Sequence, residues 1–438
     1  MITDAVAKRD PFGRRLWLIG RFRPTDSGMT NRWLVVLASA ISHMVGQGAI
    51  NVFAAGVFIA PVAMELGIGR GVMSSAFGLS SIMTAVTVPI LGRLIDRFGV
   101  RSILLPSIVA FALATAALSQ LQLAFLFPLF ALSGICGAAQ TATPYSKVVV
   151  GWFDRERGLA LGLMLVGVGL GGILAPQLAA FLIGRLGWRE AYLGMGVAIM
   201  LIAFVPTALF IRENPKAKSD ANAAPMPGVL FREALSSRSY WFLVIAFFLG
   251  SIGINAMIIH VVPILTDRGM TVGAAAAILS AGGIAGIVAR VICGYLMDRL
   301  FAPYVGIGFM ILPMLGIVLF ASGFSGSALL LGMICIGAGL GAEIDLMSFL
   351  IARYFGVRAF GALHGLMFTG FLFGQAAGGS LLGWSQQVLG SYGPGFALLE
   401  VFFVLACVLL ALLGPYRYPA SGGDGDITAA AMPVRLAA

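Results

Sequence analysis

The ionisable side chains inside long hydrophobic stretches are the residues of this sequence that could do chemistry. Arg290, Glu343 and Asp345 each lie within such a stretch, where a charge is costly unless it faces a cavity or a partner. The planar guanidinium of Arg290 is suited to bind a carboxylate through two parallel hydrogen bonds. One alternative is that Arg290 forms an ion pair with Glu343 or Asp345. Another is that it lies at the cytoplasmic end of its helix, because Asp298, in the polar break that follows, is only two turns away.

Glu343 and Asp345 are separated by two positions, which places them about 200° apart around a helix. We therefore expect the two acids to have different partners. Either could carry a proton that is coupled to movement of a substrate. The alternative is that both only hold this helix to its neighbours or to the region of Arg353. His364 is a third candidate for proton coupling, with a packing contact as its alternative.

A polar stripe runs along the first hydrophobic stretch. His43, Gln47 and Asn51 recur every four residues and would share one helix face, where they could line a pore. The alternative is that they form hydrogen bonds between helices. Lys147 lies near the end of the fourth stretch and is expected to extend to the membrane surface. The predicted substrate-binding residues are Arg290, Gln47, Asn51, Gln140 and Tyr145.

The elements that must position these residues are membrane-spanning helices. The chain of 438 residues is 59% hydrophobic and only 11% charged, with a mean hydropathy of +0.98. Strands that alternate every second residue, as in an outer-membrane barrel, are absent from the pattern. An all-α membrane protein is therefore predicted. Its twelve expected transmembrane helices are 33–62, 72–94, 102–120, 124–150, 158–183, 190–211, 240–264, 273–295, 303–322, 326–351, 361–386 and 394–414.

A repeated octapeptide divides the chain into two similar halves. The segment Gly92–Gly99 (GRLIDRFG) is echoed by Gly294–Phe301 (GYLMDRLF), and Gly158-x₃-Gly162 is echoed by Gly361-x₃-Gly365. Two repeated bundles of spanning helices, with a binding site at their interface, are typical of secondary transporters. The residues predicted to act as a conformational switch are Gly92, Asp96, Arg97, Arg101, Gly294, Asp298 and Arg299.

The polar segments set the predicted boundaries and orientation. Twenty-two of the 28 basic residues fall on one side of the predicted spans, so we expect both termini in the cytoplasm of a bacterial inner (plasma) membrane. This asymmetry makes nucleic-acid binding an unnecessary explanation of the net charge of +10. The predicted parts are a cytoplasmic N-terminal segment (1–32), a six-helix bundle (33–211), a cytoplasmic linker (212–239), a second six-helix bundle (240–414) and a cytoplasmic tail (415–438).

Other functional classes find no support in the residue pattern. All four cysteines fall within hydrophobic stretches without a ligand spacing, so neither a disulfide framework nor a metal site is expected. The sequence has no phosphate-binding G-x-x-x-x-G-K-[ST] motif, which argues against an ATP-driven pump. No arrangement of a nucleophile and a base on a soluble domain is present. We therefore expect neither an enzyme nor a bound cofactor.

The segment Gly92–Arg101 resembles the signature of the major facilitator superfamily for the loop between its second and third helices. The partial copy at Gly294–Arg299 lies between helices eight and nine, where that superfamily places it. With twelve spans, the resemblance covers nearly the whole chain. It implies two pseudo-symmetric six-helix bundles that work by alternating access.

Three segments are similar to a narrower group, the monocarboxylate transporters and oxalate:formate antiporters. They are Gly56–Arg70, Trp152–Leu163 followed by Gly187–Arg189, and His260–Gly269 followed by Arg290. In that group a helix-eight arginine binds the substrate carboxylate, and this role falls on Arg290. The chain differs from the group at three places. Where the animal monocarboxylate transporters have a lysine in helix one, this chain has a residue near Val57, and where they have an aspartate four residues before the helix-eight arginine, it has Gly286. The helix-eleven lysine of the oxalate antiporter is also missing.

The resulting expectation is a monomeric secondary transporter of a small organic anion, with a monocarboxylate as the favoured substrate. Proton symport is the favoured coupling, so protons and the lipid bilayer are the other expected partners. The alternatives are anion exchange, efflux of hydrophobic compounds, and a transporter-like receptor that binds without transporting. The short loops and the lack of a large soluble domain count against the receptor.

Overall fold

The computed structural model describes residues 32–214, 228–324 and 326–418. The chain is almost entirely helical over these residues, and eleven helices are long and apolar enough to cross a membrane. This confirms the predicted all-α membrane protein. The N-terminal segment 1–31, most of the linker (215–227) and the tail from residue 419 lie outside the described residues.

The first predicted span is interrupted, which is why it does not count as a twelfth continuous helix. α1 (Arg32–His43) ends in a turn at residues 44–46, and a π-helical segment (Ala49–Phe53) precedes α2 (Ala55–Leu66). Its companions in the N-terminal bundle are α3 (Arg70–Phe98), α4 (Val100–Ala117), α5 (Leu126–Gly137), α6 (Ala142–Trp152), α7 (Arg157–Leu186), α8 (Trp188–Ala198) and α9 (Val205–Phe210). The pairs α5–α6 and α8–α9 each form one span.

The C-terminal bundle has longer uninterrupted helices. A short helix, α10 (Phe231–Leu235), follows the linker and precedes the six spans. These are α11 (Arg238–Asp267), α12 (Val272–Met297), α13 (Ala302–Ala321), α14 (Ser327–Phe355), α15 (Phe360–Leu389) and α16 (Gly393–Ala411). Each agrees with a predicted hydrophobic stretch to within a few residues.

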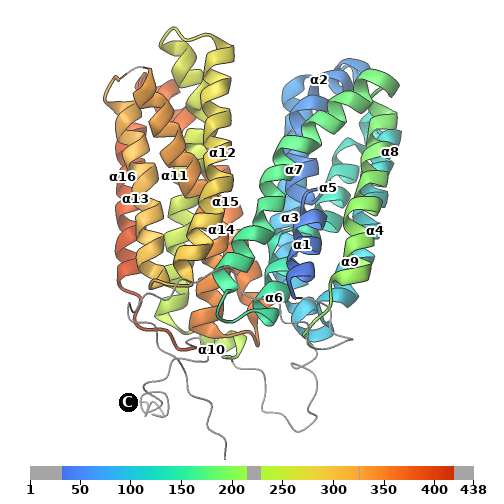
Figure 1. Cartoon of the computed structure of the whole chain (residues 1–438). Helices are drawn as coiled ribbons and strands as arrows, with labels where there is room; N and C mark the ends of the chain where they lie inside the picture. Colours follow the sequence, from blue (N-terminus) through green and yellow to red (C-terminus); the bar gives the residue numbers. More distant parts are fainter. Residues whose placement is uncertain (1–31, 215–227, 325, 419–438) are drawn as a thin grey trace, which may run out of the picture.

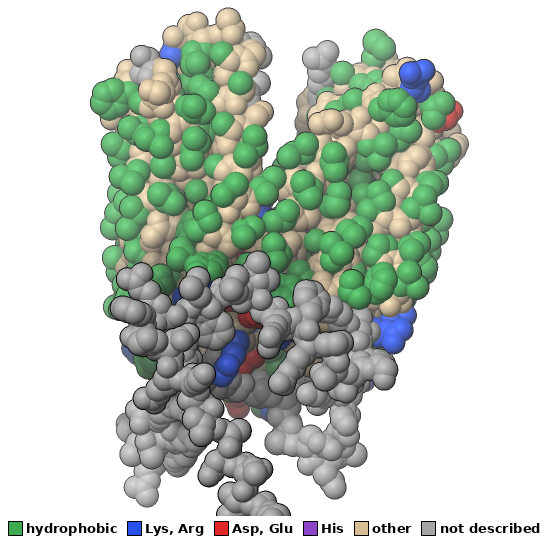
Figure 2. Space-filling model, viewed as in Figure 1, with side chains coloured by type: hydrophobic (Ala, Val, Ile, Leu, Met, Phe, Trp, Pro, Cys, Tyr) green, Lys and Arg blue, Asp and Glu red, His purple; other side chains and the backbone are tan. Residues whose placement is uncertain are grey.

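The two bundles stand side by side and meet at one end only. Figure 1 shows the helices converging near α6 and α10. We call this end the linker end, because α9 precedes the linker and α10 follows it. At the opposite end, the open end, the space-filling view shows a wedge-shaped cleft between two lobes covered with hydrophobic side chains (Figure 2). The structure therefore has a closed linker end and an accessible open end.

Two helix crossings join the bundles, and both are built on glycine. α3 crosses α15 where a Cβ on Gly92 would lie 2.1 Å from the carbonyl oxygen of Gly361. α7 crosses α12 where a Cβ on Gly158 would lie 2.3 Å from the carbonyl oxygen of Gly294. Since any side chain would overlap the opposing backbone, glycine permits this close approach. The repeated glycines of the sequence thus form the seam between the bundles.

Candidate functional site

Arg290 lies on the seam, in the middle of the α7–α12 crossing. Its carbonyl oxygen would be 2.5 Å from a Cβ on Gly162 of α7. The guanidinium is buried, and its Nη1 lies 3.7 Å from Oδ1 of Asp345 in α14. This distance is too long for a hydrogen bond, and Nη1 has no hydrogen-bond partner among the described residues. The ion pair that was the structural alternative is therefore present, but it is loose.

The two acids of α14 face different surroundings. Asp345 is fully buried beside Arg290, and neither of its oxygens accepts a hydrogen bond from any described residue. Glu343 points into the C-terminal bundle, where its Oε1 would be 3.0 Å from a Cβ on Gly250, close to Met310. Both Glu343 oxygens are buried and equally lack a partner in the part of the chain that the structure describes. One acid faces the bundle seam, and the other faces an apolar interior.

The N-terminal bundle contains a second buried polar group, formed by His43, Tyr145 and Gln140. His43 stacks on Tyr145 with ring centroids 5.0 Å apart, and the Tyr145 hydroxyl donates to Oε1 of Gln140 at 2.8 Å. The charge of Arg290 acts electrostatically on His43 across the seam. Nε2 of Gln140 is a buried donor that finds no acceptor within the described residues.

The remaining members of the predicted polar stripe are buried inside the N-terminal bundle. Asn51 donates to the hydroxyls of Ser80 in α3 and Ser133 in α5, both at 3.0 Å. Gln47 lies beside Gly137 of α5. The break after His43 takes the stripe off a single continuous helix. The Nδ2 group of Asn51 already donates two hydrogen bonds, whereas Nε2 of Gln140 is, among the described residues, an unpartnered donor that a ligand could bind.

His364 takes part in a hydrogen-bond network that connects the two bundles. Its Nδ1 lies 2.9 Å from the hydroxyl of Thr143, and its Nε2 lies 2.9 Å from the hydroxyl of Ser348. Ser348 also donates to Ser146 at 3.0 Å. Thr143 and Ser146 belong to α6, whereas Ser348 and His364 belong to α14 and α15. Both ring nitrogens of this fully buried histidine are thus engaged.

Asp96 caps a helix of the opposite bundle at the linker end. Its two carboxylate oxygens accept hydrogen bonds from the backbone N–H groups of Gly361 at 2.9 Å and Ala362 at 2.8 Å, in the first turn of α15. A carboxylate at a helix N-terminus is stabilised by the free N–H groups and the helix dipole. Lys147 adds an ion pair to Asp96 at 2.7 Å. We call this arrangement the Asp96 latch.

Asp298 forms the reciprocal contact, the Asp298 latch. Its carboxylate accepts from the N–H groups of Gly158 at 2.7 Å and Leu159 at 2.9 Å, in the first turn of α7. Within the described chain no cation lies within ion-pair distance of Asp298. Burial raises the pKa of this carboxyl above its ordinary value of 3.8, and the two backbone hydrogen bonds oppose that shift. The two latches share geometry but differ in charge balance.

The other predicted switch residues have local roles in the structure. Arg101 donates to the carbonyl oxygens of Ala208 and Ile211 and so ties α4 to the end of α9. Arg97 and Arg299 lie over the rings of Phe98 and Tyr295, respectively.

An ion pair between the bundles was missed by sequence reasoning. Arg353 of α14 binds the side chain of Asp154 at 3.1 Å and its carbonyl oxygen at 2.8 Å. The two residues are 199 positions apart, so no local spacing relates them. This pair adds an ionic contact between the bundles at the closed linker end.

Comparison with known proteins agrees with this architecture. Residues 36–379 match the family model of the Major Facilitator Superfamily. Monocarboxylate transporter 13 of Bos taurus is 25% identical over 398 residues, which are 90% of this chain and 91% of the relative. The MFS transporter asaE of Aspergillus flavus is 24% identical over 388 residues, which are 86% of this chain and 84% of the relative.

Solved structures share the fold at low sequence identity. A variant of the Escherichia coli fucose:proton symporter FucP superposes with a TM-score of 0.66 at 15% identity, covering 87% of this chain and 97% of that one. A bacterial homologue of the iron transporter ferroportin in an outward-facing state gives 0.68 at 16% identity, covering 87% and 99%. Since the family model matches well over half of the sequence, the chain belongs to the Major Facilitator Superfamily.

Proposed function

We propose that this membrane transporter carries a small organic anion, with a monocarboxylate as the favoured substrate, and that Arg290 binds the carboxylate. The observation that carries the proposal is that the Arg290 guanidinium is buried and, within the described residues, incompletely hydrogen-bonded. It is buried at the seam, 3.7 Å from Asp345, with one nitrogen lacking any hydrogen-bond partner in the described structure. Binding of a carboxylate to a buried N–H donor that has no acceptor is favourable, because it supplies the missing hydrogen bond.

Asp345 serves in this proposal as the internal counter-ion of the empty site. An uncompensated buried guanidinium is strongly unfavourable, so an acid must stay near it when no substrate is bound. A substrate carboxylate then takes the place of Asp345 beside Arg290. His43 and Gln140 complete the site from the N-terminal bundle, so a bound anion would contact both halves. Alternating access then moves the two halves about the site.

A proton supplies the coupling in the favoured version of this proposal. When the substrate displaces Asp345, that carboxylate loses its counter-ion in a buried place, and a proton would remove the resulting cost. Glu343 is the second candidate because it is buried with two unpartnered oxygens. His364 is a weaker candidate, because both of its nitrogens already bind hydroxyls that hold the bundles together.

One of the relatives supports the substrate class. Monocarboxylate transporter 13 matches nearly the full length of this chain, although at 25% identity. Other relatives are described only as transporters of the same superfamily. We also propose that the linker end faces the cytoplasm of an inner or plasma membrane, because most basic residues lie on that side of the spans. In that orientation the structure is open to the outside.

Uptake into proteoliposomes tests the proposal. A panel of labelled mono- and dicarboxylates and neutral compounds is offered with and without an inward proton gradient, and counterflow is measured separately. We expect accumulation of monocarboxylates under the gradient, and loss of high-affinity uptake in Arg290→Lys, which keeps the charge but not the planar fork. Wild-type affinity of a well-folded Lys variant would remove Arg290 from the site. Exchange without gradient-driven accumulation would indicate an antiporter.

The coupling residue is identified by separating uphill transport from exchange. Glu343→Gln and Asp345→Asn are each reconstituted and assayed for both activities. The proton carrier should lose uphill uptake but retain exchange, which needs no net proton movement. A residue that only braces helices should lose both activities together. Normal accumulation by both variants would exclude proton coupling through α14.

A further inference from the structure

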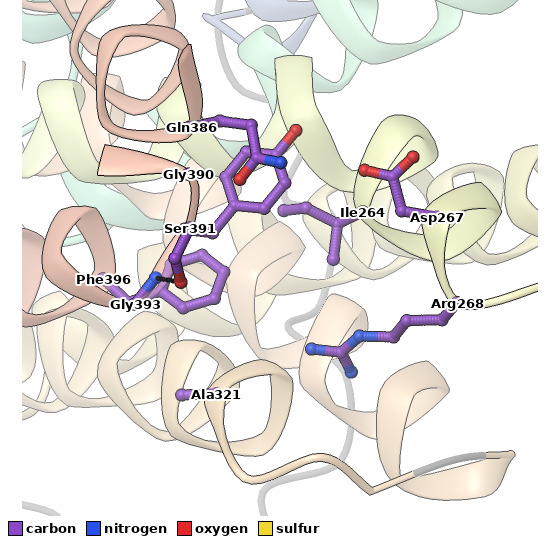
Figure 3. Close-up of a pocket in the computed structure, with 10 residues that line it drawn as sticks. Ile264, Asp267, Arg268, Ala321, Gln386, Gly390, Ser391, Gly393 and Phe396 are labelled. Carbon is purple, nitrogen blue, oxygen red and sulfur yellow. Dashed lines mark hydrogen bonds between the residues drawn. The ribbon is translucent and has the colours of Figure 1, made fainter. Parts of the chain in front are cut away.

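We propose that a second binding site, separate from Arg290, lies at the open end of the C-terminal bundle and takes a zwitterion with a primary ammonium group and an anionic group. The site is a cavity of about 320 Å³, at the lower end of the size range of ligand pockets. Figure 3 shows that its walls come from the ends of α11, α13 and α15 and from the start of α16.

One acid and one base line this cavity without pairing to each other. Asp267 and Arg268 are neighbours at the end of α11, and their charged groups point in different directions on either side of Ile264 (Figure 3). Asp267 makes no ion pair or hydrogen bond within residues 32–214, 228–324 and 326–418. Arg268 donates to the carbonyl oxygen of Phe320, which leaves most of its five N–H donors free. A ligand with one charge of each sign would satisfy both side chains.

The acidic side of the cavity has further groups that suit an ammonium ion. Tyr392 lines the same cavity as Asp267, and burial, together with the negative charge of Asp267, raises the pKa of its phenol. Gln386 brings a side-chain oxygen that is buried and accepts no hydrogen bond from the described residues. An ammonium group could donate to the Asp267 carboxylate and lie against the Tyr392 ring. The cavity therefore separates a cation-binding side from the Arg268 side.

The loop that forms the wall opposite α11 is held in place before any ligand binds. Ser385 donates to the carbonyl oxygen of Ser391 at 2.9 Å and accepts from the N–H of Gly395 at 3.0 Å. The N–H of Gly393 donates to the hydroxyl of Ser391 at 3.1 Å. His260 lies against Tyr392, with ring centroids 5.8 Å apart. Such pre-organisation reduces the entropy that binding would cost.

The position of the cavity suggests two sources for this ligand chemistry. Its walls lie where the spans 238–267, 302–321, 360–389 and 393–411 begin or end, which is the level of lipid headgroups. A phosphatidylethanolamine headgroup and a soluble phosphoethanolamine- or amino-acid-like zwitterion share the required charges. All lining residues belong to the C-terminal bundle, between Ile264 and Phe396, so the site is independent of the Arg290 seam.

Binding to the purified full-length protein tests the proposal in two arms. The soluble arm compares phosphoethanolamine with glycerol 3-phosphate, which lacks the ammonium group, by calorimetry. The lipid arm compares phosphatidylethanolamine with phosphatidylglycerol of the same chains, by native mass spectrometry. We expect a preference on the order of tenfold for the ammonium-bearing member. Preference in only the soluble or only the lipid arm identifies the source, and no preference in either arm overturns the proposal.

Variants assign the binding to this cavity. Asp267→Asn should abolish the preference for the ammonium group, and Arg268→Gln should weaken binding of the ammonium-bearing ligand. Ala321→Trp should block the cavity without changing charge, and it serves as the second test if a charge variant folds poorly. Glu190→Gln removes an exposed acid at the open end of the other bundle and is the matched control. Unchanged preference in both Asp267→Asn and Ala321→Trp would contradict the site.

Discussion

The α3–α15 and α7–α12 crossings are built alike but carry different chemistry. Each brings two glycines into backbone contact and ends in an aspartate that caps a helix of the other bundle. Gly294 and Asp298 lie 202 residues after Gly92 and Asp96, and the same shift takes Val88 to Arg290. Both positions contact a glycine across the seam, Val88 with Gly365 and Arg290 with Gly162. The duplicated packing supports both crossings, whereas only the second holds a charged group at its centre.

In the latches, by contrast, it is the α3–α15 crossing that carries the additional charge. The Asp96 latch includes Lys147 at 2.7 Å, so its carboxylate has a cation beside it. The Asp298 latch has only the backbone donors of α7, and the attractive charge that acts on it is the more distant one of Arg353. Pseudo-symmetry thus conserves the shape of the closed end and leaves the charges free to differ. The predictions below test whether the shared packing or the unequal charges control the cycle.

Removing the charge from the α7–α12 crossing should have the largest effect. Arg290→Leu leaves Asp345 buried without a partner, and we expect a loss of about 3–5 kcal/mol in stability. Arg290→Leu/Asp345→Leu should recover much of that loss, because no unpaired charge remains. Thermal unfolding in detergent measures both variants, with Val88→Leu as the control at the equivalent position. Additive losses in the double variant would show that the two charges do not interact.

Adding a methyl group to either glycine crossing should come next. Gly92→Ala and Gly158→Ala place a Cβ against the opposing backbone, which cannot move aside as a side chain could. We expect the closed linker end to lose about 1–3 kcal/mol relative to the open state. Cysteine accessibility at the linker end reports this change. Gly151→Ala is the matched control, because nothing lies near its added Cβ, and equal behaviour of all three variants would refute the seam.

Neutralising the aspartate should have a larger effect on transport in the Asp96 latch than in the Asp298 latch. Asp96→Asn leaves the partly buried Lys147 without its ion partner, so turnover should slow by roughly tenfold while equilibrium substrate affinity changes little. Asp298→Asn removes no ion pair and should have a smaller effect. Initial transport rates and binding are measured in the same preparations. A larger effect of Asp298→Asn, or a large change of affinity in Asp96→Asn, would contradict this ranking.

The Asp298 latch should give a small pH dependence. Its pKa is raised in the closed state, whereas in an opened, hydrated latch it should return toward 3.8. The closed state then binds more protons between these two values. It is therefore favoured as the pH falls through the raised pKa, and it loses that advantage as the pH rises. Linker-end accessibility against pH measures the effect. Asp298→Asn should abolish it, and an unchanged pH profile in this variant would assign the dependence to another group.

The sequence located the glycines and the ionisable side chains of the seam but not most of their partners. The glycine-aspartate repeat and the intramembrane positions of Arg290, Glu343 and Asp345 are evident from local patterns. The 200° separation of the two acids also predicted their different surroundings. Lys147 was expected to extend to the membrane surface, and the structure instead pairs it with Asp96. That contact depends on helix packing that no spacing encodes.

Hydropathy and repeats determined the approximate ends and the two-bundle grouping of the helices, because a lipid solvent demands about 20 apolar residues for each span. The tertiary structure decided three things. It interrupted the first span after His43, where Gly46 packs against the carbonyl oxygen of Gln140. It brought Asp96 to the N–H groups of Gly361 and Ala362, and the ring of His364 to the hydroxyl of Thr143. The last two contacts join residues more than 200 positions apart, so they exist only once the two halves have packed together.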